Sequence, residues 1–227
     1  MPFEDLAERV AEVRGRVAEA VRRGGHGQEV TIVAVTKTHG PEAARAAWAA
    51  GIGDVGENKV QEASAKLAEV DLPLRWHLIG HLQRNKVKAL AHFHLFHALD
   101  SSRLADAVDA EGQRRGSPVD VLVQVNVSGE ATKGGFPAAE IEREAARLSA
   151  MPGLRVRGAM TMAPLDADER TLREVFAGCR RAAERLRAVG HPAHELSMGM
   201  SNDYEVAVEE GATLVRLGTL LFGARGT

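Results

Sequence analysis

Val30-Thr31-Ile32-Val33-Ala34-Val35-Thr36-Lys37 is the stretch of sequence that decides the fold. Its first six residues are mostly β-branched and apolar, the pattern of a short strand that is buried on both faces. Gly40 and Pro41 end the strand, and a helical pattern follows them. In parallel α/β folds, sites are built where strands end and helices begin. The stretch therefore predicts a buried strand that places Lys37 at the edge of a site.

Lys37 is the rarer kind of basic residue in this chain. Of the 29 lysine and arginine residues only six are lysines, which leaves 23 arginines, so positive charge alone is usually met with arginine. Lysine is the basic side chain that can lose its proton and attack a carbonyl carbon. The alternative is a lysine that caps the strand end and extends its amine into water. Position alone leaves both interpretations open.

Size and composition limit the class of protein. A chain of 227 residues with 44% apolar residues can bury a real core in one large domain or two small ones. The net charge of −2 and the lack of a long basic block argue against nucleic acid as a partner. Neither a signal-peptide pattern nor an apolar run of about 20 residues is present, so we expect no membrane span and a cytoplasmic location. Cys179, the only cysteine, excludes an internal disulfide and a cysteine-based metal site, and is expected to be a small filler on a helix.

Strand and helix patterns alternate along the whole chain. After Val30–Val35, the further strands are expected at 51–55, Leu74–Ile79, Phe93–Leu99, Val119–Val127, Leu154–Met160, Glu195–Ser197 and Thr213–Leu217. Helices are expected at Phe3–Arg23, 41–50, 59–70, Gln83–Ala91, behind a Ser101-Ser102 cap, and at Pro137–Ala150, Asp168–Val189 and Asn202–Glu210. Eight such strands predict one α/β domain over residues 1–227, a single (β/α)8 barrel with an extra N-terminal helix. The alternative, an open doubly wound sheet, would carry a glycine-rich loop after the first strand, and residues 36–40 are not one.

Barrel closure predicts which loops surround Lys37. The last strand must lie beside the first, so the loops after the seventh and eighth strands lie next to the lysine. These loops read Ser197-Met198-Gly199-Met200-Ser201-Asn202 and Gly218-Thr219, and both are rich in small residues and hydroxyls, as a phosphate site needs. The alternative is a helix capped by Ser201 or Asn202 with no ligand.

Arg216 is the third predicted component of this site. It interrupts the apolar run Leu214–Leu217, and a buried guanidinium needs an acceptor, either a carboxylate inside the barrel or an atom of a ligand. A lysine that can form an imine, a phosphate cradle and a cationic donor together suit a phosphorylated aldehyde, of which pyridoxal 5′-phosphate (PLP) is the obvious biological example. Arginine at the ring nitrogen would keep that nitrogen unprotonated and disfavour most carbanion chemistry.

Seven blocks of sequence together resemble the YggS/PROSC-type PLP homeostasis proteins along nearly the whole chain. The blocks are Ala34–Thr38, Gly56–Glu62, Trp76–Lys86, Val125–Ser128 with Glu130 and Lys133, Gly158–Pro164, Leu196–Asp203 and Val215–Thr219. The resemblance implies a barrel like the N-terminal domain of alanine racemase, which is fold type III of PLP proteins. It also implies a Schiff base on Lys37, phosphate contacts at Ser197, Ser201, Gly218 and Thr219, and Arg216 at the ring nitrogen. Asn58 and His77 match positions that line the pocket, and His39 stands where many relatives have a second lysine.

Three functions remain open at this stage. The resemblance favours a protein of PLP homeostasis that holds PLP and hands it to acceptors such as apo PLP-dependent enzymes, without efficient catalysis of its own. A racemase-like enzyme needs a second proton carrier opposite the lysine, which relatives bring as a tyrosine from a second domain, and the only tyrosine here is Tyr204. The third function is an interaction protein with a vestigial pocket. We expect a monomer or weak dimer and no metal site.

Overall fold

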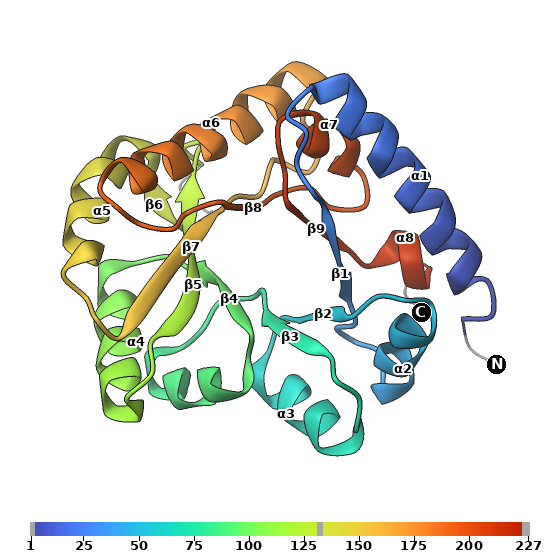
Figure 1. Ribbon diagram of the computed structural model, residues 1–227, viewed down its shortest axis with the longest axis horizontal. Coiled ribbons are helices and arrows are strands. Elements are labelled where there is room, and N and C mark those ends of the chain that lie inside the picture. Colours follow the sequence, from blue (N-terminus) through green and yellow to red (C-terminus); the bar gives the residue numbers. More distant parts are fainter. Residues whose placement is uncertain (1–2, 131–133, 224–227) are drawn as a thin grey trace.

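The computed structural model describes residues 3–130 and 134–223, and its centre is a closed barrel of eight parallel strands (Figure 1). The barrel strands are β1 (Thr31–Val35), β2 (Asp54–Glu57), β3 (Arg75–Leu78), β4 (Leu95–Leu99), β5 (Val119–Asn126), β7 (Leu154–Met160), β8 (Glu195–Ser197) and β9 (Leu214–Leu217). β1 pairs with β2 on one side and β9 on the other, and the pairing of β4 with β5 closes the ring. The predicted barrel is confirmed.

Helices cover the outside of the ring (Figure 1). They are α1 (Leu6–Gly24), α2 (Pro41–Ala49), α3 (Val60–Glu69), α4 (Ser102–Arg115), α5 (Ile141–Ser149), α6 (Glu169–Ala188), α7 (Tyr204–Glu209) and α8 (Thr219–Phe222), with 3₁₀ segments η1 (Arg84–His92) and η2 (Ala138–Glu140). α6 begins at a side-chain cap, because Asp168 accepts from the Thr171 amide. Cys179 is buried in α6, as expected of a small filler.

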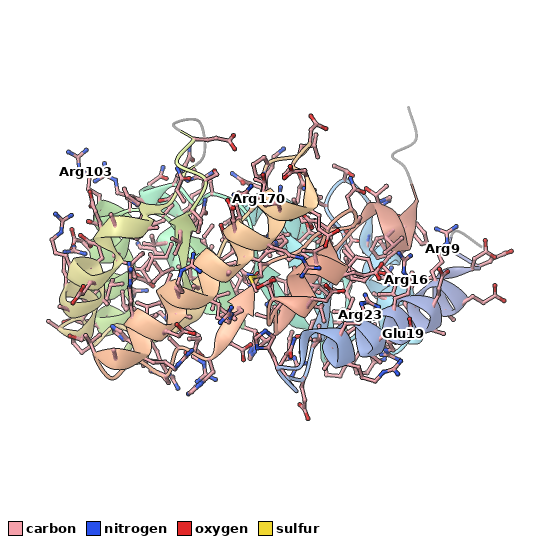
Figure 2. All side chains as sticks on the ribbon, turned by 90° about the horizontal axis from the view of Figure 1, so that it is seen from above. Arg9, Arg16, Glu19, Arg23, Arg103 and Arg170 are labelled. Carbon is pink, nitrogen blue, oxygen red and sulfur yellow. The ribbon has the colours of Figure 1, made fainter. Side chains whose placement is uncertain are left out.

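The extra helix α1 lies outside the barrel against α7 and α8 (Figure 1). One apolar stripe of α1 is buried from Leu6 to Val17, and the small Ala20 is more buried than Val21. Ion pairs reinforce this contact. Arg16 and Arg23, which are spaced along α1 in Figure 2, both pair with Glu205 of α7. Packing and charge thus fix α1 to the helices that follow the last two strands.

Four predicted elements differ from the structure. β2 begins at Asp54 and runs through Glu57, not over 51–55, because the buried Glu57 continues the strand. The helix expected at Gln83–Ala91 is the 3₁₀ segment η1. The segment expected to be helical from Pro137 is first a two-residue strand, β6 (Phe136–Pro137), which pairs with β5. Ser101 occupies the N-cap position of α4, but its side chain makes no capping hydrogen bond.

Two predictions, on membrane spans and on Lys133, are compared here with the part of the chain that the structure describes. No helix in residues 3–130 or 134–223 is long and apolar enough to cross a membrane. Residues 131–133, which include Lys133 of the resemblance, lie outside the described part of the chain.

Candidate functional site

A cavity of about 790 Å³ lies at the carboxyl ends of the barrel strands. Six of the nine predicted site residues line it: Lys37, Asn58, Ser201, Arg216, Gly218 and Thr219. They come from the ends of β1, β2, β8 and β9, so closure of the ring brings them together as the prediction requires. The other three, His77, Ser197 and Met198, are fully buried and do not line the cavity.

The end of β1 is anchored from below by a buried polar group. Lys66 donates to the Thr36 carbonyl at 2.8 Å and to Glu57, and the Thr36 hydroxyl donates to the same Glu57 carboxylate. All three residues are at most 5% exposed. The backbone leading into Lys37 is thereby fixed, and Lys37 itself is partly exposed at the cavity.

Thr38, directly after Lys37, has a backbone in the left-handed region with φ of 70°. A non-glycine residue in this region costs of order 1 kcal/mol and persists where the surrounding structure imposes it. Such strain is concentrated at functional sites. The chain thus turns sharply away at the position where Lys37 meets the cavity.

Arg216 extends from the barrel core to the cavity floor. Its guanidinium donates to the Ser197 hydroxyl and to the Thr161 carbonyl at 3.0 Å, while only 5% of the residue is exposed. Burial lowers the pKa of Arg216 to about 10, and Asp203 and Cys179 oppose that shift. The carboxylate partner considered from the sequence is not among its hydrogen-bond partners in the described residues. Arg216 therefore remains cationic at neutral pH and is held by neutral acceptors.

The two small-residue loops are tied together across the cavity. The Ser201 hydroxyl accepts from the Leu220 amide at 3.2 Å, and Asp203 accepts from the Met200 amide at 2.6 Å. Gly199 has φ of 92°, and a Cβ there would lie 2.7 Å from Ala207, so only glycine allows this loop to pack on α7.

Amide donors remain available at these loops. Among the described residues, the N–H groups of Ser201, Asn202 and Thr219 have no hydrogen-bond acceptor, and all three residues line the cavity. Uncommitted N–H groups beside a cation form an anion site. Together with the Lys37 amine, this donor set fits a small anionic molecule that carries a carbonyl group.

One polar pair at the cavity was not predicted from the sequence. The His81 Nδ1 lies 2.7 Å from a carboxylate oxygen of Asp100, and both residues line the cavity. Since the carboxylate accepts, Nδ1 carries the proton and Nε2 is left as the atom that can take one. The sequence does not indicate the pairing of His81 with Asp100, because that pairing depends on strand order.

Two sequence expectations concern residues outside the cavity. Tyr204 does not line it; the residue is 3% exposed, and Arg16 lies over its ring at 5.7 Å. His39 packs against Phe3 and Phe222 in an aromatic cluster. Within the described residues, no group of three or more histidine, cysteine, aspartate or glutamate side chains could hold a metal ion.

The barrel and its cavity place the chain in the class of alanine racemase N-terminal domains, a family that residues 10–226 match. The alanine racemase of Corynebacterium glutamicum shares the fold, with a TM-score of 0.74 at 17% identity, over 98% of this chain and 61% of that chain. The chain is also 42% identical to the pyridoxal phosphate homeostasis protein of Pseudomonas aeruginosa, over 97% of this chain and 96% of the relative. PipY of Synechococcus elongatus, solved with PLP bound, matches with a TM-score of 0.85 at 37% identity, over 96% of this chain and all of that one. The chain belongs to the family of pyridoxal phosphate homeostasis proteins.

Proposed function

We propose that this chain binds PLP in the cavity at the carboxyl ends of the strands and hands it to acceptor molecules. Lys37 is the amine that takes the aldehyde, the amides of the two loops hold the phosphate, and Arg216 faces the ring nitrogen. The observation that carries the proposal is the convergence of Lys37, Arg216 and the uncommitted loop amides on one cavity. The PLP bound in the related PipY structure supports the choice of ligand.

The role of each residue follows from its environment. Bound PLP supplies an aldehyde that can be exchanged between amines. Lys37 supplies one amine, Arg216 stays cationic and donates into the cavity, and Asn58 lines the wall beside Lys37. Ser197 accepts a hydrogen bond from Arg216 beneath the cavity, and the buried His77 and Met198 support the cavity floor without touching the ligand.

An incoming amine must lose a proton before it can displace Lys37. His81 can take that proton at Nε2, because Asp100 holds the ring through Nδ1. Asp100 also lines the cavity and offers a negative charge to an ammonium group. The acceptors are therefore primary amines, including the lysines of apo PLP-dependent enzymes, and the chain acts on them as a monomer or weak dimer.

A racemase-type enzyme is the second candidate, because the His81–Asp100 pair could serve as the second proton carrier. The position of Tyr204 outside the cavity speaks against it, since that residue cannot take the part played by the tyrosine of racemases. Alanine racemisation by the PLP-loaded protein decides between the two. A racemase turnover of about 10 per second, an ordinary enzyme rate, would refute the carrier proposal.

Absorbance titration with PLP tests the binding site. We expect the wild-type protein and Lys59→Ala to give the same saturable visible band, and Lys37→Ala to lose it. Lys59 is the matched control because it follows the lining residue Asn58 but its amine pairs with Glu62 on the surface. Equal bands in all three proteins would refute Lys37 as the attachment point.

A further inference from the structure

A chain of hydrogen bonds crosses the barrel interior from Arg216 to the opposite rim. Arg216 donates to the Ser197 hydroxyl, which lies 2.8 Å from His97 Nδ1. His97 Nε2 lies 2.8 Å from His77 Nδ1, and His77 Nε2 lies 2.9 Å from an Asp54 carboxylate oxygen. We call these five residues the interior chain. It joins β9, β8, β4, β3 and β2, so it exists only when the ring is closed.

The proton positions along the interior chain follow from its two ends. The carboxylate of Asp54 can only accept, so a neutral His77 carries its proton on Nε2 and accepts at Nδ1. His97 must then donate from Nε2 and accept at Nδ1. The hydroxyl of Ser197 donates to that nitrogen, which turns an oxygen lone pair toward Arg216. With both histidines neutral, only one arrangement satisfies every hydrogen bond. In it each residue donates to the next one along the series that runs from Arg216 to Asp54.

Burial makes this arrangement costly to disturb. His77, His97 and Ser197 are each at most 1% exposed, and Asp54 and Arg216 are each 5% exposed. A buried polar group without a partner loses the energy of its contact with water, so reversing one member would leave its neighbours unsatisfied. Burial, together with the charge of Arg216, holds the pKa of His97 well below the ordinary histidine value, which keeps that ring neutral.

The far end of the interior chain lies at a second cavity. Asp54 also accepts two hydrogen bonds from Arg75, at 2.7 and 2.6 Å. Both residues line this second cavity of about 680 Å³, between α1 and the amino ends of β1, β2 and β3. The interior chain therefore connects the two ends of the barrel.

We propose that Asp54, His77, His97 and Ser197 are positioning residues for Arg216. By fixing which atom donates in each hydrogen bond between them, they keep the guanidinium cationic and directed into the cavity. The inference concerns the protein without ligand, and its bearing on PLP rests on the proposed function. The titratable or charged groups that face the two histidines are Arg216, Asp54, Arg75 and His94. Those that face Arg216 are Asp203 and Cys179.

Nitrogen-15 spectra of histidine-labelled, PLP-free protein test the proton positions directly. We expect both His77 and His97 to carry a proton on Nε2, and the Nε2–H form of His97 to be favoured at least about tenfold over its Nδ1–H form, as one hydrogen bond warrants. His97 protonated at Nδ1 would overturn the proposal, because its direction would then be reversed.

A distant substitution tests the coupling. Asp54→Ala removes the terminal acceptor without touching His97 or Arg216. We expect a mixture of tautomers at His97, and faster proton exchange at the Arg216 guanidinium in arginine-labelled protein. His94→Gln is the matched control: this histidine contacts His77 edge to face but lies outside the interior chain, and we expect it to change neither signal. An unchanged His97 tautomer in Asp54→Ala would overturn the proposal, and because PLP is absent, that failure is separate from any failure of PLP binding.

Discussion

Lys37 and Lys66 carry the same side chain into opposite environments. Lys66 is buried and hydrogen-bonded to Glu57 and to the Thr36 carbonyl just after β1, so its charge stabilises the fold. Lys37 is partly exposed at a cavity and follows the strand that Lys66 stabilises. Burial, not residue type, thus separates the structural lysine from the one proposed to react.

Replacing Lys66 with methionine tests this distinction. Lys66→Met leaves the Glu57 carboxylate buried without its cation, so we expect a loss of about 3 kcal/mol in the free energy of unfolding. Denaturation in urea measures the loss. The double substitution Lys66→Met with Glu57→Leu removes both charges and should recover part of it. A single variant as stable as wild type would contradict the structural role.

Asp54 gives the stability a defined dependence on pH. Burial alone would raise its pKa, but hydrogen bonds from His77 and Arg75 outweigh burial and the pKa is lowered from 3.8. A carboxyl group whose pKa is lowered by folding stabilises the protein above that ordinary value, and the stabilisation is lost as the pH falls through the folded-state pKa. We expect the unfolding free energy of wild type to fall more steeply below about pH 4 than that of Asp54→Ala. Asp71→Asn, at an exposed position, is the control and should follow wild type.

His81 is expected to matter for release more than for binding. His81→Gln keeps a polar side chain but removes the proton acceptor, so transfer of PLP to a primary amine should slow by about a hundredfold, the low end for general base catalysis. Stopped-flow absorbance measures the transfer, and His92→Gln, at an exposed position of η1, is the control. Transfer at the wild-type rate would mean that solvent removes the proton.

At the scale of elements, apolar periodicity was the reliable signal. Strands with an apolar run, such as β1, or with alternating apolar residues, such as β7, were placed within one residue of their observed bounds. β2 was misplaced because its last residue is Glu57. A charged residue usually indicates a loop, and the sequence does not show that Glu57 is buried with Lys66 as its partner. β6 was missed because a two-residue strand has no periodicity and exists only through its pairing with β5.

Helix α1 allows the contributions of packing and of charge to the free energy of unfolding to be measured separately. Val13 is 2% exposed, and Val13→Ala should cost about 2 kcal/mol in the free energy of unfolding. Arg16 pairs with Glu205 at a half-exposed surface, so Arg16→Gln should cost less than about 1 kcal/mol. Denaturation in urea compares the two variants. A larger loss for Arg16→Gln would mean that the charge contacts, and not the apolar stripe, hold α1 on the barrel.

At the scale of the molecule, barrel closure is what made the site predictable. Order along the sequence separates Lys37 from Arg216 by most of the chain, yet the pairing of β1 with β9 follows from the fold class alone. Six predicted residues therefore meet at one cavity. The interior chain could not be predicted, because it depends on which side chains point inward at matching heights on five strands. His97, for example, makes two hydrogen bonds inside the barrel that no pattern in the sequence indicates.

The central claim is that Lys37 is the attachment point for PLP in the cavity at the carboxyl ends of the barrel strands. Borohydride reduction of the protein incubated with PLP, followed by peptide mass mapping, tests it most directly. The account predicts one stable adduct, on Lys37, and none on the buried Lys66 or the surface Lys59. No adduct, or adducts spread over several lysines, would contradict it and favour an interaction protein with a vestigial pocket.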